Sequence, residues 1–270
     1  MHESGSYIRT FIDKVRMFLE EPDIDSKYSD SLLLRYYAQP AYQDVVSRLS
    51  NTVGCPVVLQ YRLVFDGSLR RYVLPPCVQQ VLNLRILDED EEDQEMFELV
   101  PRSRWHRDGP GWELEGNAGN LALVMQHLPP DGMVARIYYT TNGDFQAHLG
   151  SGTLARVGGT ARVALAATPT LGLLDRRENA LAGQCLRILS SSPLPICTRQ
   201  ITRSYLAGST WYAEVDDDFP TEIADGSITY EAVPSGDSMF WEAVSCWAAM
   251  KLGVGRKITE NHREDLRLQY

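Results

Sequence analysis

The chain has 270 residues, 44% of them hydrophobic and 23% charged, a composition that allows a globular core and excludes wholesale disorder. Its net charge of −10 excludes tight wrapping of nucleic acid unless the basic residues cluster. The five cysteines include no CxxC pair, so we interpret them as buried, reduced thiols of a protein made in a cytosol, with neither a zinc site nor disulfides.

The first fifty residues are predicted to form helices. Apolar residues recur at helical spacing from Ile8 to Leu19, and Glu21-Pro22 should end that helix. A second helix should begin at Ser29, whose hydroxyl can cap the first turn. Because Pro40 lacks an amide donor, we expect a kink or break near Ala38. The apolar stripe of the second helix would be Leu33, Tyr37, Ala41, Val45 and Leu49.

From Pro56 to Tyr230 the pattern changes to short runs rich in β-branched and aromatic residues, separated by turn signals. No helical period intervenes, so we predict antiparallel sandwich or barrel architecture. The glycine-containing stretches 116–120 and 150–159 are predicted to be hairpin loops. We expect a strand over Ala135–Tyr139 to pair with one over Ile228–Tyr230. Other expected strands are 57–59, 61–65, 72–74, 81–87, 96–100, 112–114, 121–126, 161–166, 184–189, 199–205 and 211–215.

The last part of the chain is predicted to be helical again. Its aromatic-rich apolar face has more surface than one helix pair need bury, so part of it could face a neighbouring subunit. Gly253 and Gly255 should interrupt this helix, and Ile258–Tyr270 should form a polar final helix. The residues expected to pack the helical core are Leu33, Tyr37, Phe240, Trp241, Val244 and Trp247.

The predicted fold class is therefore α+β: a helical bundle core formed by the N- and C-terminal segments, with a large antiparallel, sandwich- or barrel-like β insertion. Residues 1–55 and 236–270 would form the helical core, residues 56–150 an antiparallel β region, and residues 151–235 a second, small β module returning to the core. The two chain ends would lie in one body, from which the β region projects.

No segment shows a pattern typical of catalysis, so we predict no enzyme, no catalytic residue and no metal or cofactor site. The acidic run Asp88–Asp93 lacks the glycine and alternation of a calcium loop and is interpreted as a solvated turn. The five histidines are isolated and are interpreted as surface or half-buried groups. Neither a GxSxG elbow nor a phosphate-binding loop occurs.

Basic residues form small groups at Arg70-Arg71, Arg102–Arg107, Arg176-Arg177 and Arg256-Lys257. Trp105 lies within the second group, which could form a platform for single-stranded nucleic acid. Small basic groups spread over an acidic chain are more typical of exposed loops, or of contacts with an acidic neighbouring subunit, than of a nucleic-acid-binding site.

Four stretches, taken in order along the chain, resemble the head-to-tail connector or adaptor proteins of tailed bacteriophages. Each motif is short and none is catalytic; their order over nearly the whole chain carries the resemblance. Pro40 departs from the uninterrupted second helix of that family. The stretches are Tyr28–Leu34; Arg71–Pro75 with Val81–Ile86; Asp225–Pro234; and Phe240–Val244 with Ala248-Ala249 and Tyr270. Leu181–Val215 is also similar to a small β module of phage structural proteins.

The resemblance implies a virion protein of the neck or tail, made in the host cytoplasm. It would form a homo-oligomeric ring, commonly of twelve copies, between the portal protein and the tail or nozzle proteins. The ring would extend the DNA channel, and packaged DNA would pass during ejection without sequence-specific binding. The C-terminal segment would be a portal-binding arm anchored by Leu266, Leu268 and Tyr270. No membrane contact is expected, because neither a signal peptide nor an apolar run of about 20 residues is present.

Two other classes remain open from the residues alone. One is a β-sandwich receptor- or carbohydrate-binding module of a virion or surface protein, which exposed aromatic residues would favour. Its platform would comprise Trp105, Trp112, Tyr138, Tyr139, Trp211 and Tyr212. The other is a β-sandwich glycosidase, for which only Glu113 and Glu115, on one face of a strand, stand out.

Overall fold

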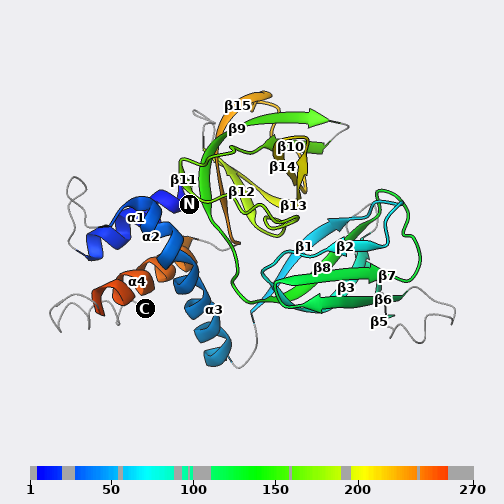
Figure 1. The fold of residues 1–270 in the computed structure, drawn as a ribbon, viewed down its shortest axis with the longest axis horizontal. Helices are drawn as coiled ribbons and strands as arrows, with labels where there is room; N and C mark the ends of the chain where they lie inside the picture. Colours follow the sequence, from blue (N-terminus) through cyan, green and yellow to red (C-terminus); the bar gives the residue numbers. More distant parts are fainter. Residues whose placement is uncertain are drawn as a thin grey trace.

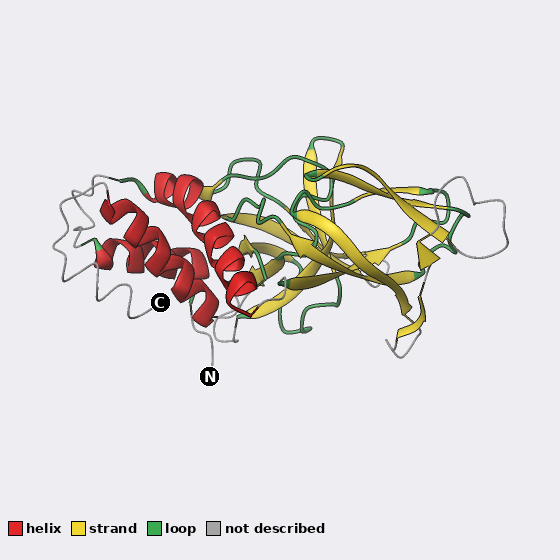
Figure 2. Cartoon of the chain, turned by 90° about the horizontal axis from the view of Figure 1, so that it is seen from below, coloured by secondary structure: helices red, strands yellow, loops and turns green. Residues whose placement is uncertain are grey.

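In a computed structural model, the chain forms three bodies: a helical bundle, a β-sandwich and a β-barrel (Figure 1). The structure describes residues 5–19, 28–53, 57–87, 93–96, 98–99, 111–157, 160–189, 196–235 and 238–254. The helices pack together and flank large antiparallel sheets, which confirms the predicted α+β class. Seen from below, the helices gather at one end of the molecule and the strands fill the rest (Figure 2).

The bundle contains α1 (Tyr7–Phe18), α2 (Asp30–Leu33), α3 (Gln39–Val53) and α4 (Ser238–Val254). Ser6 and Ser29 cap the first two helices, accepting hydrogen bonds from the amides of Arg9 and Leu32. The predicted cap at Ser29 is thereby confirmed. The prediction that Gly253 interrupts the last helix is wrong, because α4 continues to Val254. Gly255 and Ile258–Tyr270 lie outside the described residues.

Between α2 and α3 the chain forms one π-helical segment, η1 (Leu34–Ala38). Proline cannot donate the hydrogen bond that an α-helix requires of Pro40, and a π turn is one way to accommodate the missing donor. The irregularity lies where it was expected, near Ala38, but it is a π turn within a continuous helix and not a break. The extra residue rotates the rest of the helix, so Ala41, Tyr42, Val45 and Val46 are buried, whereas Leu49, expected in the apolar stripe, is 42% exposed.

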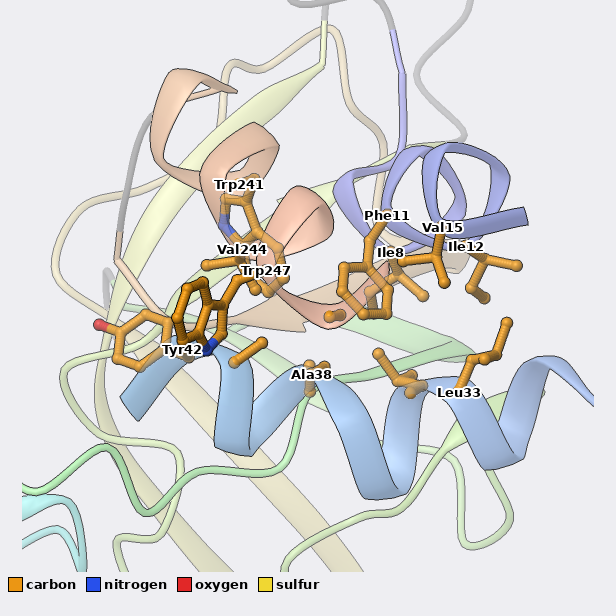
Figure 3. Packing of buried hydrophobic residues seen from close by; sticks show 14 of the residues in the cluster. Ile8, Phe11, Ile12, Val15, Leu33, Ala38, Tyr42, Trp241, Val244 and Trp247 are labelled. Carbon is orange, nitrogen blue, oxygen red and sulfur yellow. The ribbon is translucent and has the colours of Figure 1, made fainter. Parts of the chain in front are cut away.

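The core of the bundle unites both ends of the chain (Figure 3). Ile8, Phe11, Ile12 and Val15 of α1 face Trp241 and Val244 of α4, while Leu33, Ala38 and Tyr42 close the third side. Trp241 and Trp247 are both buried within this one subunit. Two helices, α1 and α3, cover the buried part of the aromatic face of α4, while Phe240 and Met250 are only partly buried; contact of this face with a neighbouring subunit stays a prediction.

The β-sandwich consists of two four-stranded sheets in the orders β1-β8-β3-β4 and β2-β7-β6-β5. Their facing side chains, among them Tyr61, Leu84, Trp112 and Ile137, form one apolar core. The strands are β1 (Val58–Val64), β2 (Arg71–Val73), β3 (Val78–Leu87), β4 (Asp93–Met96), β5 (Glu98–Leu99), β6 (Gly111–Asn117), β7 (Asn120–Met125) and β8 (Val134–Thr141).

The second β body closes on itself. Its strands pair antiparallel in the order β9-β10-β14-β13-β12-β15, and β15 pairs back with β9. Closure removes free edges and encloses an apolar core that includes Leu154, Val163, Ile201 and Tyr230. The strands are β9 (His148–Val157), β10 (Thr160–Ala164), β11 (Leu171–Gly172), β12 (Cys185–Ile188), β13 (Cys197–Ala207), β14 (Thr210–Val215) and β15 (Gly226–Val233).

Three predictions about this body differ from the structure. The stretch from Gly150 was expected to be a hairpin loop but lies inside β9, one of the longest strands of the barrel. The segment Ile228–Tyr230 was expected to pair with Ala135–Tyr139, yet it pairs with β9 and β12, while β8 pairs with β1 and β3. The boundary expected at residue 151 falls inside β9, so the barrel begins at His148.

Candidate functional site

The bundle carries a groove where η1 meets the segment leading into the barrel. Its volume is about 220 Å³. Tyr36 stands at its rim with 57% of its surface exposed, and the Arg35 guanidinium lies 5.2 Å from the centroid of the Tyr36 ring. Because π turns are frequent at functional sites, this groove is the bundle's candidate contact site. The groove is lined by Leu34, Arg35, Tyr36, Gln39, Phe145, Gln146, Ala147, Gly172 and Leu173.

Gly172 explains how closely the barrel approaches η1. Its φ of +77° is a conformation that favours glycine, and a β-carbon there would lie 2.9 Å from Leu34 Cδ2. A β-carbon there would lie closer still to the backbone carbonyl oxygen of Ala147, so the close approach of β11 at this position requires glycine. This contact forms one wall of the groove.

A charged cluster marks the corner where α3 crosses α4. The Trp247 indole donates a hydrogen bond of 2.6 Å to Asp44, and Lys251 lies 3.0 Å from the same carboxylate. The Arg48 guanidinium lies 3.9 Å above the Trp247 ring. Burial alone would raise the pKa of Asp44, but the hydrogen bond from Trp247 and the charge of Lys251 hold it below its ordinary value. The cluster fixes the crossing of the two helices and gives this corner two cations and one anion.

A second cleft, of about 420 Å³, separates the sandwich from the barrel. Carboxylates of Asp66, Asp131, Glu178 and Glu214 line it together with arginine side chains. Asn179 spans the two bodies: it donates a 2.8 Å hydrogen bond to the Val73 carbonyl and has a φ of 55°. Among the described residues, no group of three or more His, Cys, Asp or Glu side chains could hold a metal ion.

All six residues predicted to pack the helical core lie in one cluster. Leu33, Trp241, Val244 and Trp247 are buried, and Tyr37 and Phe240 are partly buried against them. Their sequence spacing was sufficient to find them. The three residues of the expected portal-binding arm, Leu266, Leu268 and Tyr270, lie outside the described residues. So do residues 88–92 of the acidic run, whose last residue, Asp93, begins strand β4.

The expected aromatic platform is only partly at the surface. Trp112 and Tyr139 are buried in the sandwich core, whereas Tyr138, Trp211 and Tyr212 are half-buried. Tyr212 stacks on Tyr205 with ring centroids 5.9 Å apart, and arginines cover the outer sides of this pair. Ring faces that are already occupied offer a ligand little stacking surface. Trp105 lies outside the described residues.

In each of the two basic groups that the structure describes, one arginine forms an ion pair within the chain. Arg177 pairs with Asp175 at 2.6 Å and Asp144 at 3.0 Å, which raises its pKa. Arg71 lies 3.6 Å from Glu115, one of the two glutamates considered for a glycosidase. Contact of either group with a neighbouring subunit stays a prediction. The groups at 102–107 and 256–257 lie outside the described residues.

His148 departs from the expected surface position, since it is fully buried on β9. Four cysteines are described, and all are free thiols: Cys77 and Cys246 are buried, while Cys185 and Cys197 are half-buried. Burial raises the pKa of the Cys77 thiol to about 11, which makes it unreactive. Cys55 lies outside the described residues.

Comparison with protein-family models, with curated proteins and with solved structures finds no match to this chain. Within the described residues, no helix has both the length and the apolar character needed to cross a membrane.

Proposed function

We propose that the chain is a non-enzymatic virion protein, the adaptor subunit that joins the portal of a tailed bacteriophage to its tail. The observation that carries the proposal is the helical body assembled from both ends of the chain, with α1 and α3 packed on α4. That body is the part that docks beneath the portal in the adaptor family which the sequence resembles. The sandwich and barrel project from it and supply surface for tail proteins and neighbouring copies.

The contacts of the aromatic residues support this function over a carbohydrate-binding module. A sugar-binding platform needs open ring faces, whereas Trp112 and Tyr139 are buried and the Tyr205–Tyr212 stack is covered by arginines. The chain's acidic character also suits a channel that DNA passes without binding. In this proposal the chain forms a ring, commonly of twelve copies, under the portal protein.

The test is to mix the purified chain with the portal protein encoded in the same genome. Native mass spectrometry and electron microscopy should show a ring of chain copies attached to one face of the portal. Absence of any affinity between the two proteins would overturn the adaptor proposal. Binding to a carbohydrate array but not to the portal would favour the binding module.

Two matched variants place the docking face. Tyr36 on the bundle groove and Leu206 on the barrel are both large, apolar and more than half exposed, at 57% and 53%. If the bundle docks on the portal, Tyr36→Ala should weaken portal binding about tenfold or more, whereas Leu206→Ala should leave it unchanged. Equal effects of the two changes would contradict a docking face on the bundle.

A further inference from the structure

On the outer wall of the barrel, Arg187 of β12 stands directly opposite Glu231 of β15. Their strand neighbours Leu186, Ile188 and Tyr230 point inward and belong to the barrel core. By strand alternation, this polar pair should therefore face solvent. Instead, both side chains are fully buried.

The N-terminus of α1 covers the pair. The Ser6 hydroxyl donates a 2.6 Å hydrogen bond to Glu231 Oε2, and the amides of Tyr7 and Ile8 donate at 2.9 and 3.2 Å. First-turn amides have no partner within a helix, and a negative charge is favoured at this end of the helix dipole. Glu231, although more than 220 positions away, thus serves as an anionic cap for α1.

Arg187 extends the contact into the bundle. It forms an ion pair with Glu231, and its guanidinium lies 3.5 Å from the centroid of the Tyr7 ring. Tyr7 in turn stacks on Trp241 of α4, with ring centroids 6.1 Å apart. A continuous set of contacts therefore runs from the barrel wall through the start of α1 to α4.

We propose that Arg187 and Glu231 form a docking site for the N-terminus of α1, and that this site sets the orientation of the helical bundle on the barrel. Other contacts between the bodies include apolar ones, such as Leu149 and Val233 against the bundle core, and apolar contacts are not directional. A buried charge pair needs donors at defined positions, because unsatisfied buried charges are costly, and so it specifies one arrangement. The inference does not depend on the adaptor function.

The first experiment measures amide hydrogen exchange in Glu231→Gln, with the exposed Glu222→Gln as the matched control. Removing the charge should speed exchange at the first-turn amides of α1 by about tenfold or more, while β9 and β10 keep their protection. The milder Ser6→Ala removes one donor to Glu231 and the acceptor of the Arg9 amide, so it should speed exchange at Arg9 as well but have a smaller effect at Tyr7 and Ile8. Unchanged α1 exchange in both variants, or uniform loss over the whole chain in Ser6→Ala, would overturn the proposal.

The second experiment measures orientation directly. Spin labels on unnatural amino acids at the exposed positions Met17 and Ser209 report the distance between the bundle and the barrel. The wild-type background should give one narrow distance distribution. The double change Arg187→Met with Glu231→Leu, which keeps an apolar contact but removes the charges, should broaden or shift it. An identical narrow distribution in the double variant would show that apolar packing alone sets the orientation.

Discussion

His148 is a titratable group held where its charged form is disfavoured. It faces inward on β9 opposite Ala232, and its Nε2 lies 3.3 Å from the Tyr230 hydroxyl. Desolvation lowers its pKa from 6.5 to about 4, outweighing the opposing influence of the Gln146 backbone and of Asp175. The folded protein therefore holds this ring neutral at pH values where the unfolded chain protonates it.

This difference predicts a pH dependence of stability. The folded pKa lies below the unfolded one, so the unfolded state binds more protons between pH 6.5 and about 4, and stability falls as pH falls through that window. The loss attributable to His148 should total about 3 kcal/mol. Melting temperatures of His148→Phe should vary less with pH over this range, whereas Tyr230→Phe, which keeps the imidazole, should retain the wild-type slope. If the melting temperatures of wild type and His148→Phe changed with pH in parallel, the assignment of this pH dependence to His148 would be contradicted.

Gly152 shows why a short glycine motif misled the prediction of a loop. The segment Gly150-Ser151-Gly152 is typical of a turn in sequence, but in β9 the glycines allow close approach by neighbouring barrel strands. A β-carbon on Gly152 would lie 2.9 Å from the Tyr230 ring and closer still to the Ala164 carbonyl oxygen. Such crowding depends on strands distant in sequence, so the local pattern could not reveal it.

We therefore predict that Gly152→Ala lowers the free energy of unfolding by about 2 kcal/mol or more, because backbone and ring must both move. Gly5→Ala is the control, since the nearest contact of a β-carbon there is at 3.7 Å. Chemical denaturation of both variants is the measurement. A Gly152 variant as stable as the Gly5 variant would mean that β9 has room to relax.

At the scale of elements, periodicity and propensity found the helices and most strands, since each reflects local burial on one face. Sequence reasoning also located the irregularity at Pro40, because the missing amide is a local fact. It did not anticipate the rotation that a π turn adds, and so it placed Leu49 in the core stripe. Arg187 is a different case: strand alternation places its side chain on the outer wall of the barrel, and the docking of α1, which is distant in sequence, buries it.

The π segment leads to a prediction about deletions. A π turn contains one residue more than an α turn, so removing Tyr36 should convert η1 to α-helix while both flanking segments keep their buried faces. We expect this deletion to cost about 1 to 2 kcal/mol, partly from the donor that Pro40 lacks. Deleting the exposed Ser47 instead should rotate the end of α3 by about 100° and disturb its packing against α4 more severely. Equal losses of thermal stability in the two deletion variants would show that η1 does not contain one residue more than the α-helix needs.

At the scale of the whole molecule, the sequence predicted a helical body made from both chain ends and placed the division of the β insertion at residue 151, just inside β9, but it did not predict how the strands pair. Strand pairing across the barrel joins β9 to β15, some 80 positions apart, and nothing local in either strand indicates its partner. The docking site for α1 likewise unites Ser6 with Glu231. Both features depend on contacts between residues far apart in the sequence, and secondary-structure propensities carry no information about such contacts.

The adaptor proposal is most directly tested at the C-terminus. If Ile258–Tyr270 is a portal-binding arm, truncation after Arg256 should leave a soluble, folded subunit, because the bundle core ends with Leu252 of α4. The truncated chain should lose portal binding, since few anchors, expected to be Leu266, Leu268 and Tyr270, would carry most of the binding energy.

Circular dichroism serves as the folding control for this truncation, and decoration of portal rings seen by electron microscopy is the measurement. A triple change of the same anchors to serine in the full-length chain should reproduce the loss without shortening the polypeptide. The helical signal and the burial of Trp241 and Trp247, followed by tryptophan fluorescence, should stay unchanged in both variants. Portal rings decorated at wild-type occupancy by either variant would move the docking role from the arm to the bundle, where the groove beside Tyr36 is the remaining contact site.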